Sequence, residues 1–275
     1  MNQAKVVRRL FLLIAAAGFC VMPQPASAEV IARSGPAAVS LLEVYSSEGC
    51  SSCPPGETWL SGLTEDAGLW TKFVPVAFHV DYWDYLGWKD PLSQKRFSDR
   101  QRNYAGFWQS SSVYTPGFVL NGKEWQSWHR RAPGVPERKG KPGELVVEGA
   151  ASGEYKVWYK PAKGALPENA SGLVLHAALL GSSITTDVRA GENAGRKLKH
   201  DFAVLDYVEK AFLPPAAGDD AWNQQARLEA PSRYSGASRP NRSAIAVWVS
   251  RADDPTPLQA AGAYLHKKSI KDVKY

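Results

Sequence analysis

The sequence predicts an α/β domain with an inserted helical segment, followed by an all-β sandwich domain. Between Val39 and about Trp128, apolar strand-like segments alternate with helix-like segments, a pattern typical of a sheet covered by helices. Beyond residue 135 most segments are strand-like, and turn-rich stretches separate them, which favours a sandwich. Residues 132–143 are rich in proline and glycine and have the composition of a linker between the two patterns.

The elements of the first domain, residues 29–135, follow from hydrophobic periodicity and turn residues. Strands are predicted at Val39–Tyr45, Phe73–Val80 and Phe118–Leu120, and helices at Pro54–Leu63 and Pro91–Phe107. The Asn121-Gly122 pair after the third strand is typical of a hairpin turn. The tryptophan-rich surplus between the second and third strands is predicted to form the helical insertion.

The second domain, residues 136–275, is predicted to be built from strands. Glu154–Lys160 alternates polar and apolar residues, and Leu173–Leu180 and Ala244–Ser250 are apolar runs, so each is a predicted strand. Val204–Phe212 fits either a strand or a short helix, and its periodicity leaves both open.

Residues 1–28 have the pattern of an export signal. Basic residues are followed by the apolar run Leu10 to Val21, which is too short to span a bilayer, and then by Ala26-Ser27-Ala28, a small-residue cleavage pattern. We predict cleavage after Ala28 and a periplasmic or secreted protein. Cys20 raises the alternative of a lipid anchor, but the bulky Phe19 before it argues against acylation.

The charge pattern excludes some partners. Loss of the three basic residues of the leader halves the formal net charge of +6, and the remaining basic residues form no long run. We therefore expect no nucleic-acid partner. No second apolar run has membrane length, so we expect no stable membrane span.

Cys50 and Cys53 give the strongest chemical signal. They lie between a predicted strand and a predicted helix, so Cys50 is expected at a helix N-terminus, where the helix dipole favours a thiolate. A thiolate attacks disulfides, and Cys53 is placed to displace what Cys50 captures. The alternatives are a structural disulfide, which in so short a loop is a weak constraint, and half of a zinc site, which lacks a second cysteine pair.

Glu43 is a candidate proton-transfer group seven residues before Cys50. If this carboxyl group is buried beneath the dithiol, desolvation raises its pKa, and it can exchange a proton with Cys53. The alternative is an edge-facing carboxylate or one paired with a lysine.

Two further segments are candidates for substrate binding. A cis proline at Thr115-Pro116 would present main-chain groups to a substrate strand, although proline is also ordinary at the start of a strand. Tyr82 and Trp83 follow the second predicted strand, and should lie near Cys50 because ligands bind beyond the carboxyl ends of such strands. These aromatic residues can line a groove for an unfolded peptide or pack inside the helical insertion.

A cluster of titratable side chains accompanies Tyr82 and Trp83. His79, Asp81 and Asp84 can coordinate a metal or move protons. The alternative is that they cap the next helix and satisfy buried backbone groups.

Three ordered motifs, Glu43 to Pro55, Ala77 to Pro91 and Val113 to Pro116, resemble the secreted bacterial proteins of domain-of-unknown-function family 1223. Gly191 to Arg196 resembles a further element of this family. The resemblance implies a thioredoxin-like first domain in which Cys50 is the nucleophile, Cys53 the resolving cysteine and Pro116 the cis proline. Glu43 only approximates the buried acid of thioredoxins, because it lies one residue further from the dithiol.

The sequence thus predicts a secreted or periplasmic thiol–disulfide oxidoreductase that acts on protein or peptide thiols through Cys50 and Cys53. It needs no organic cofactor because the dithiol holds the electrons. Ser51-Ser52, between the cysteines, matches neither thioredoxin nor the strong periplasmic oxidants, so the direction of electron flow stays open. The prediction requires Cys50 to be ionised and reachable near pH 7.

Two other function classes stay open. One is a copper-binding module that uses Cys50, Cys53 and His79, since thiolate and imidazole ligands suit copper. The other is a non-catalytic interaction protein in which the sandwich binds a partner.

Overall fold

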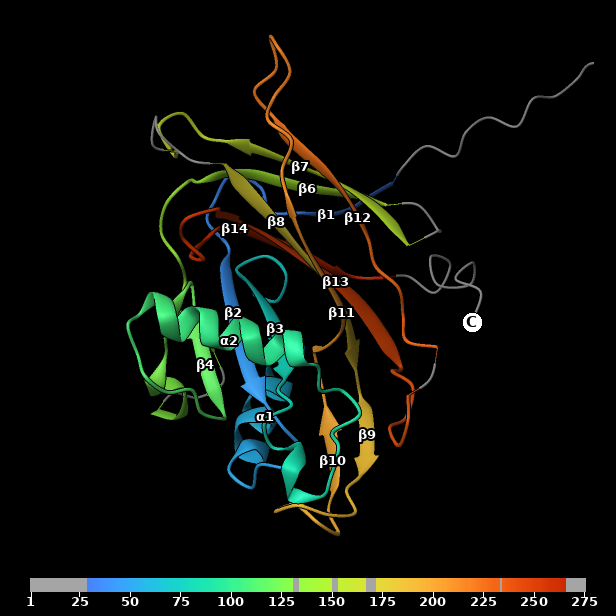
Figure 1. Cartoon of the computed structure of the whole chain (residues 1–275). Helices are drawn as coiled ribbons and strands as arrows, with labels where there is room; N and C mark the ends of the chain where they lie inside the picture. The colour runs from blue at the N-terminus through green and yellow to red at the C-terminus, as the bar shows by residue number, and fades with distance from the viewer. Residues whose placement is uncertain (1–28, 131–133, 150–152, 167–171, 233, 266–275) are drawn as a thin grey trace, which may run out of the picture.

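The computed structural model describes residues 29–130, 134–149, 153–166, 172–232 and 234–265 (Figure 1). The predicted signal peptide, its cleavage site after Ala28 and Cys20 lie outside the described residues.

An eight-stranded mixed sheet forms the centre of the fold, with the strand order β14-β13-β8-β11-β3-β2-β4-β5. Its strands are β2 (Ser40–Ser46), β3 (Phe73–His79), β4 (Gly117–Leu120), β5 (Lys123–Glu124), β8 (Leu173–Ser182), β11 (Ala203–Ala211), β13 (Arg242–Arg251) and β14 (Pro257–Tyr264). β2 and β3 are parallel, and every residue of both is buried. Burial on both faces explains why these two strands are continuous apolar runs rather than alternating ones.

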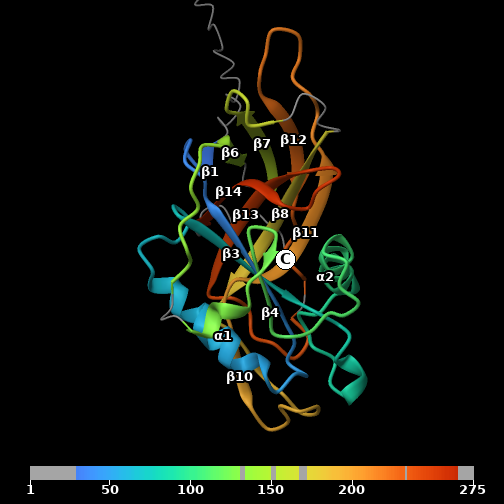
Figure 2. The same cartoon turned by 90° about the vertical axis from the view of Figure 1, so that its left-hand side faces the viewer.

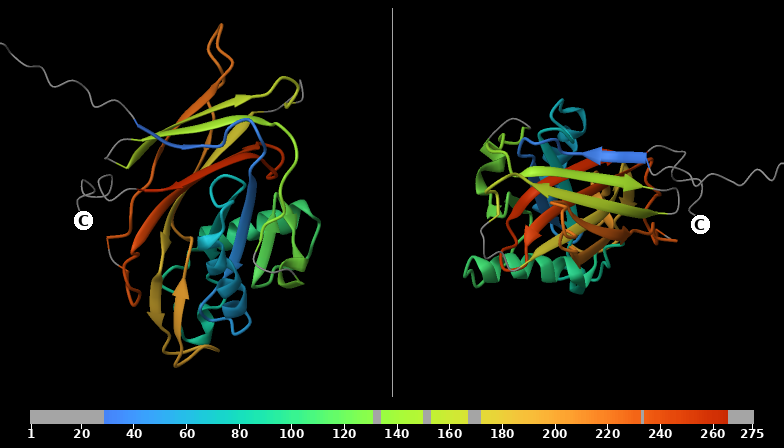
Figure 3. Two further views of the ribbon diagram at one scale, coloured as in Figure 1. Left: turned by 180° about the vertical axis from the view of Figure 1, so that it is seen from behind. Right: turned by 90° about the horizontal axis from the view of Figure 1, so that it is seen from above.

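A four-stranded antiparallel sheet with the order β1-β6-β7-β12 lies over part of the large sheet (Figure 3, right). It consists of β1 (Glu29–Arg33), β6 (Gly143–Gly149), β7 (Glu154–Pro161) and β12 (Trp222–Arg227). β6 alternates buried and half-buried residues, as expected for a strand with one face on a core. β8 and β13 supply apolar side chains to two cores, one beneath this sheet and one beneath the helices.

Two α-helices lie on opposite sides of β2, β3 and β4 in the described chain (Figure 2). They are α1 (Cys53–Ser61) and α2 (Lys95–Phe107), and three short 3-10 helices accompany them, η1 (Gly62–Glu65), η2 (Asp84–Leu86) and η3 (Gln126–Arg130). Prolines occupy the first turn of α1, where the missing N–H groups have no helical partner to lose. A two-stranded hairpin of β9 (Ile184–Asp187) and β10 (Lys197–His200) extends from the end of β8 toward α1.

The predicted fold class is wrong. The sequence predicted a thioredoxin-like α/β domain with a helical insertion and then a separate β-sandwich, but the chain is mostly strand and β8, β11, β13 and β14 share one sheet with β2 and β3. The two halves are joined at the parallel pair of β11 and β3, where the Ala77 N–H donates to the Phe202 carbonyl at 2.9 Å. Hydrophobic periodicity identifies a strand but not its neighbour, which explains the error.

Three further predictions concern the helical insertion, the segment Val204–Phe212 and the domain boundary. The tryptophan-rich segment after β3 contains only the short η2 before α2, so the predicted helical insertion is absent from this described segment. The open segment Val204–Phe212 is a strand, β11. The boundary at residue 135 lies in the connection between η3 and β6, and the division into domains of residues 29–135 and 136–275 stays a prediction.

Candidate functional site

The two cysteines lie where β2 leads into α1. Cys53 is the first residue of α1 and Ser52 is its N-cap, so Cys50 lies just before the helix rather than within its first turn. The Cys53 N–H donates to the Cys50 carbonyl at 3.2 Å, which folds the two residues toward each other. Both are free thiols.

The sulfurs have opposite acid–base character. A hydrogen bond from Cys53 is the largest cause that lowers the pKa of Cys50, to about 6, and burial opposes it. Burial raises the pKa of Cys53 well above its ordinary value, and the adjacent Cys50 raises it further. The expected direction for Cys50 is therefore found, and its largest cause is the neighbouring thiol.

The expectation that Cys50 is reachable is wrong for this conformation. Both cysteine residues are 0% exposed. The preceding loop is covered at Gly49, where an added Cβ would lie 3.0 Å from Trp83 Cβ. Asn193 covers it from another side, since its Nδ2 donates to the carbonyls of Glu48 and Cys50, each at 2.8 Å.

The segment between β9 and β10 is a part of the site that was indicated beforehand only by the family resemblance of Gly191 to Arg196. Besides Asn193, Glu192 contributes, because its carboxylate accepts the Ser51 N–H at 2.8 Å. These residues lie about 140 positions from the dithiol in the sequence. No local pattern predicts such a contact.

The predicted substrate-binding residues are brought to the dithiol. The Thr115-Pro116 peptide bond is cis, and the Thr115 carbonyl lies 3.7 Å from the Cys50 sulfur. The Trp83 indole donates to the Thr115 hydroxyl at 2.8 Å. Burial raises the pKa of Tyr82, and the charges of Cys53 and Cys50 raise it further, so Tyr82 lies within electrostatic reach of both sulfurs.

A cavity of about 300 Å³ adjoins this region. Tyr114, Gly117, Gln101 and Trp108 contribute to its lining. Its lining comes from α2, β4, β5 and the segment that joins α2 to β4.

Glu43 occupies a different cluster from the one predicted. Its carboxylate pairs with the Arg100 guanidinium at 2.7 Å and accepts hydrogen bonds from Tyr104 at 2.5 Å and Tyr45 at 3.1 Å. All four side chains are buried. Both carboxylate oxygens of Glu43 therefore already accept hydrogen bonds from these three side chains. We assign Glu43 to the ion pair beneath α2 rather than to proton exchange with Cys53.

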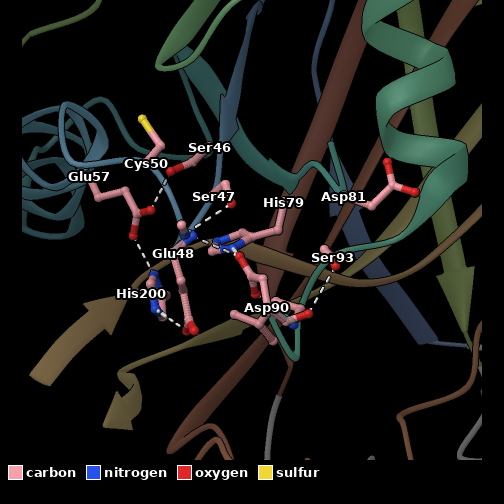
Figure 4. A network of polar contacts seen from close by, with 12 residues as sticks. Ser46, Ser47, Glu48, Cys50, Glu57, His79, Asp81, Asp90, Ser93 and His200 are labelled. Atoms are coloured by element: carbon pink, nitrogen blue, oxygen red, sulfur yellow. Dashed lines mark hydrogen bonds and ion pairs between the residues drawn. The ribbon is translucent and has the colours of Figure 1, made fainter. Parts of the chain in front are cut away.

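Glu57 is a buried acid close to Cys53 that was not predicted from the sequence. It lies one helical turn after Cys53, and its charge raises the pKa of that thiol. Its carboxylate accepts a hydrogen bond from Ser46 and faces His200 Nδ1 (Figure 4). Burial alone would raise the pKa of Glu57, but the His200 charge and hydrogen bond lower it. The spacing of Cys53 and Glu57 on one helix face was the available signal.

A second imidazole completes this buried network. His200 Nε2 lies 3.0 Å from a Glu48 carboxylate oxygen, and His79 Nδ1 lies 2.7 Å from Asp90. The two rings are 4.8 Å apart and nearly perpendicular. Burial opposes charge on both imidazoles, but their carboxylate partners raise both pKa values.

The geometry separates the residues that the sequence grouped around His79. Asp81 accepts from Ser98, and Asp84 accepts from Ser93 and from the Asp90 N–H, which are turn and helix-start contacts. Among the described residues, the side chains close enough to share one ion are Glu57, His79 and His200. This set excludes both cysteines, so the arrangement does not support the copper site predicted from Cys50, Cys53 and His79.

Two solved structures resemble this one. Protein AGR_C_4864 from Agrobacterium tumefaciens is 21% identical, with a TM-score of 0.51, over 84% of this chain and 96% of that chain. HBP35 of Porphyromonas gingivalis is 14% identical, with a TM-score of 0.57, over 88% of this chain and 80% of that chain. At these identities the likeness shows the fold alone.

The sequence was also compared with curated proteins and with protein families, and the helices of the structure were checked for membrane length. No curated protein matches the sequence. In the part of the chain that the structure describes, no helix is both long and apolar enough to cross a bilayer. The family described as "Protein of unknown function (DUF1223)" matches residues 41–250. The chain therefore belongs to this family of proteins of unknown function.

Proposed function

We propose that the protein is a thiol–disulfide oxidoreductase of protein or peptide thiols, in which Cys50 attacks and Cys53 resolves. The observation that carries this proposal is the hydrogen-bonded pair of free thiols with opposite pKa shifts. A pair of this kind is one nucleophile at neutral pH with a protonated partner beside it, which is the starting state for disulfide exchange.

The steps follow from these charges. The Cys50 thiolate attacks a substrate disulfide, a mixed disulfide forms, and one substrate thiolate leaves. The negative charge of Cys50 is then gone, and with it two causes that raise the pKa of Cys53. Cys53 gives its proton to the departed substrate thiolate through solvent, attacks the Cys50 sulfur and releases the second substrate thiolate. The protein dithiol thereby becomes a disulfide and supplies two electrons. The same steps in reverse oxidise a substrate dithiol.

Glu57 takes the place that the sequence argument gave to Glu43. Its carboxylate charge raises the pKa of Cys53, which keeps the resolving thiol protonated until Cys50 is bonded to substrate. We propose this electrostatic role for Glu57, with Ser46 and His200 fixing the orientation of its carboxylate.

Substrate access requires the cover over the dithiol to open, because both cysteines are buried. Trp83, Thr115 and Asn193 are the contacts that must loosen. Once they do, the substrate meets the Thr115-Pro116 backbone and the aromatic rings of Tyr82 and Trp83. The adjoining cavity offers room for a neighbouring peptide side chain.

We also propose that the protein works in the periplasm or outside the cell, where a disulfide can persist. Fusion of residues 1–28 to a reporter that is active only after export tests this. Export of the reporter supports it, and a reporter retained in the cytoplasm refutes it.

Trapping of mixed disulfides tests the oxidoreductase proposal. Cys53→Ser should accumulate mixed disulfides through Cys50, since the resolving step is removed, and Cys50→Ser should accumulate none. Mass spectrometry of the non-reduced adducts identifies the attached thiols. If the wild-type protein exchanges no faster than free cysteine, or if both variants trap equally, the proposal fails and a non-catalytic interaction protein becomes the better interpretation.

A further inference from the structure

A second site lies beneath the dithiol; it shares Glu57 with the proposed thiol chemistry but includes neither sulfur. Glu57 from α1, His79 from β3 and His200 from β10 each offer one ligand atom, and these atoms all lie within 4.8 Å of one another. All three side chains are buried. Figure 4 shows the Cys50 sulfur turned away from this cluster.

Each imidazole is held from behind by its own carboxylate. Asp90 contacts Nδ1 of His79 and Glu48 contacts Nε2 of His200. The other nitrogen of His200, Nδ1, faces Glu57, and the other nitrogen of His79, Nε2, has no hydrogen-bond partner among the described residues. The two outer carboxylates are themselves fixed: Asp90 accepts the Glu48 N–H at 2.9 Å, and Glu48 accepts the Trp88 indole N–H at 2.6 Å. A carboxylate behind each imidazole is the arrangement that orients histidine ligands in metal sites.

One donor atom in the cluster has no partner. His79 Nε2 is buried and has no hydrogen bond to any described residue, while the rest of its ring is 1% exposed. Buried polar atoms are nearly always satisfied, and a ring nitrogen of His79 lies within 4.8 Å of the ligand atoms of Glu57 and His200. A ligand between the three side chains would satisfy it.

The charges of the cluster also suit a dication. Three carboxylates, Glu48, Glu57 and Asp90, surround two imidazoles whose rings lie 4.8 Å apart. Two neighbouring imidazolium ions repel each other in a buried site. A divalent metal bound by neutral imidazoles carries the same total charge as those two protons, and it removes the repulsion.

We propose that Glu57, His79 and His200 form a binding site for a single divalent transition-metal ion, with zinc as the expected occupant. Two imidazole nitrogens and one carboxylate oxygen are a common zinc ligand set that leaves one coordination position open. Binding exchanges the Glu57–His200 hydrogen bond for two bonds to the metal. It also ties α1 and β3 to β10, which lies far from both in the sequence, so bound metal stabilises the folded chain.

The test uses purified protein stripped of metal with a chelator and then titrated with Zn²⁺ by calorimetry, in the wild type and in Cys50→Ser/Cys53→Ser. We expect one ion per chain in both and a rise in the melting temperature on binding. Co²⁺ as a probe should show ligand-field absorption without thiolate-to-metal charge transfer. Absence of stoichiometric Zn²⁺ binding at micromolar metal, or binding that needs the cysteines, overturns the proposal.

Variants locate the ion. Glu57→Gln and His79→Gln should each weaken Zn²⁺ binding by about tenfold or more, and so should Asp90→Asn through the ring that it orients. His176→Gln is the matched control, because it replaces a buried histidine of a different cluster. Circular dichroism establishes folding. If His79→Gln does not fold, the near-isosteric Glu57→Gln decides, and unchanged affinity in that variant refutes the site.

Discussion

Removal of the Cys53 thiol tests the central electrostatic argument. Its hydrogen bond is the largest cause that lowers the pKa of Cys50 from 9.0 to about 6. At pH 7, a pKa of about 6 leaves about nine-tenths of Cys50 as thiolate, whereas the ordinary value leaves about one-hundredth. Cys53→Ala should therefore shift the pKa of Cys50 upward by more than one unit and lower its thiolate fraction at pH 7 to below about one half.

The assay is the rate of Cys50 alkylation measured from pH 4 to pH 10. Because Cys50 is buried, the residues that cover it must move away before it can react. This opening multiplies the alkylation rate by the same factor at every pH, so the midpoint of the pH profile is unchanged. The midpoint therefore reports the pKa, and Cys53→Ser is the matched control because its hydroxyl can still donate. A wild-type midpoint near 9, or equal midpoints in the wild type and Cys53→Ala, would refute the reasoning.

Three further predictions concern the cover, the core and the pH response. Asn193→Ala should speed Cys50 alkylation by about tenfold without moving its pH midpoint, and an unchanged rate would show that this side chain does not hold the cover. Arg100→Leu leaves the Glu43 carboxylate buried without its ion pair and should cost about 3–5 kcal/mol in urea unfolding; a loss below about 1 kcal/mol would contradict the assigned role. Burial opposes the charge on His79, but its carboxylate partner raises the imidazole pKa above 6.5. The resulting stability is complete below pH 6.5 and is lost as the pH rises through the folded-state pKa. As the pH rises above 6.5, the melting temperature of the metal-free protein should fall, and it should fall less in His79→Gln. If the melting temperature falls equally with pH in both proteins, the assigned role of His79 is contradicted.

Local patterns predicted the elements around the dithiol well. The predicted strand, helix and strand at Val39–Tyr45, Pro54–Leu63 and Phe73–Val80 correspond to β2, α1 and β3. Apolar runs and proline placement act within a few residues, so they can be recognised without the rest of the chain. The same kind of pattern could not show that β11 pairs with β3, and this is why the fold class was wrong.

The identity of the acid near the dithiol also depended on contacts that the local sequence does not reveal. Glu43 and Glu57 are both buried carboxylates near the cysteines in sequence, and only their partners distinguish them. Arg100 pairs with Glu43 across 57 positions, and His200 pairs with Glu57 across 143. A carboxylate's role depends on the charge that faces it, and neither partner can be identified from spacing alone.

Short stretches of sequence were enough to predict the dithiol, its place between a strand and a helix, and the Thr115-Pro116 and Tyr82-Trp83 segments that reach it. These are properties of short segments, fixed by side-chain periodicity and backbone preference. Only the folded chain shows that Cys50 is covered, that the charge of Glu57 raises the pKa of Cys53, and that His79 and His200 meet beneath the sulfurs. Burial and pairing are set by residues remote in the chain, so the free energies that govern the chemistry arise only when the sheet assembles.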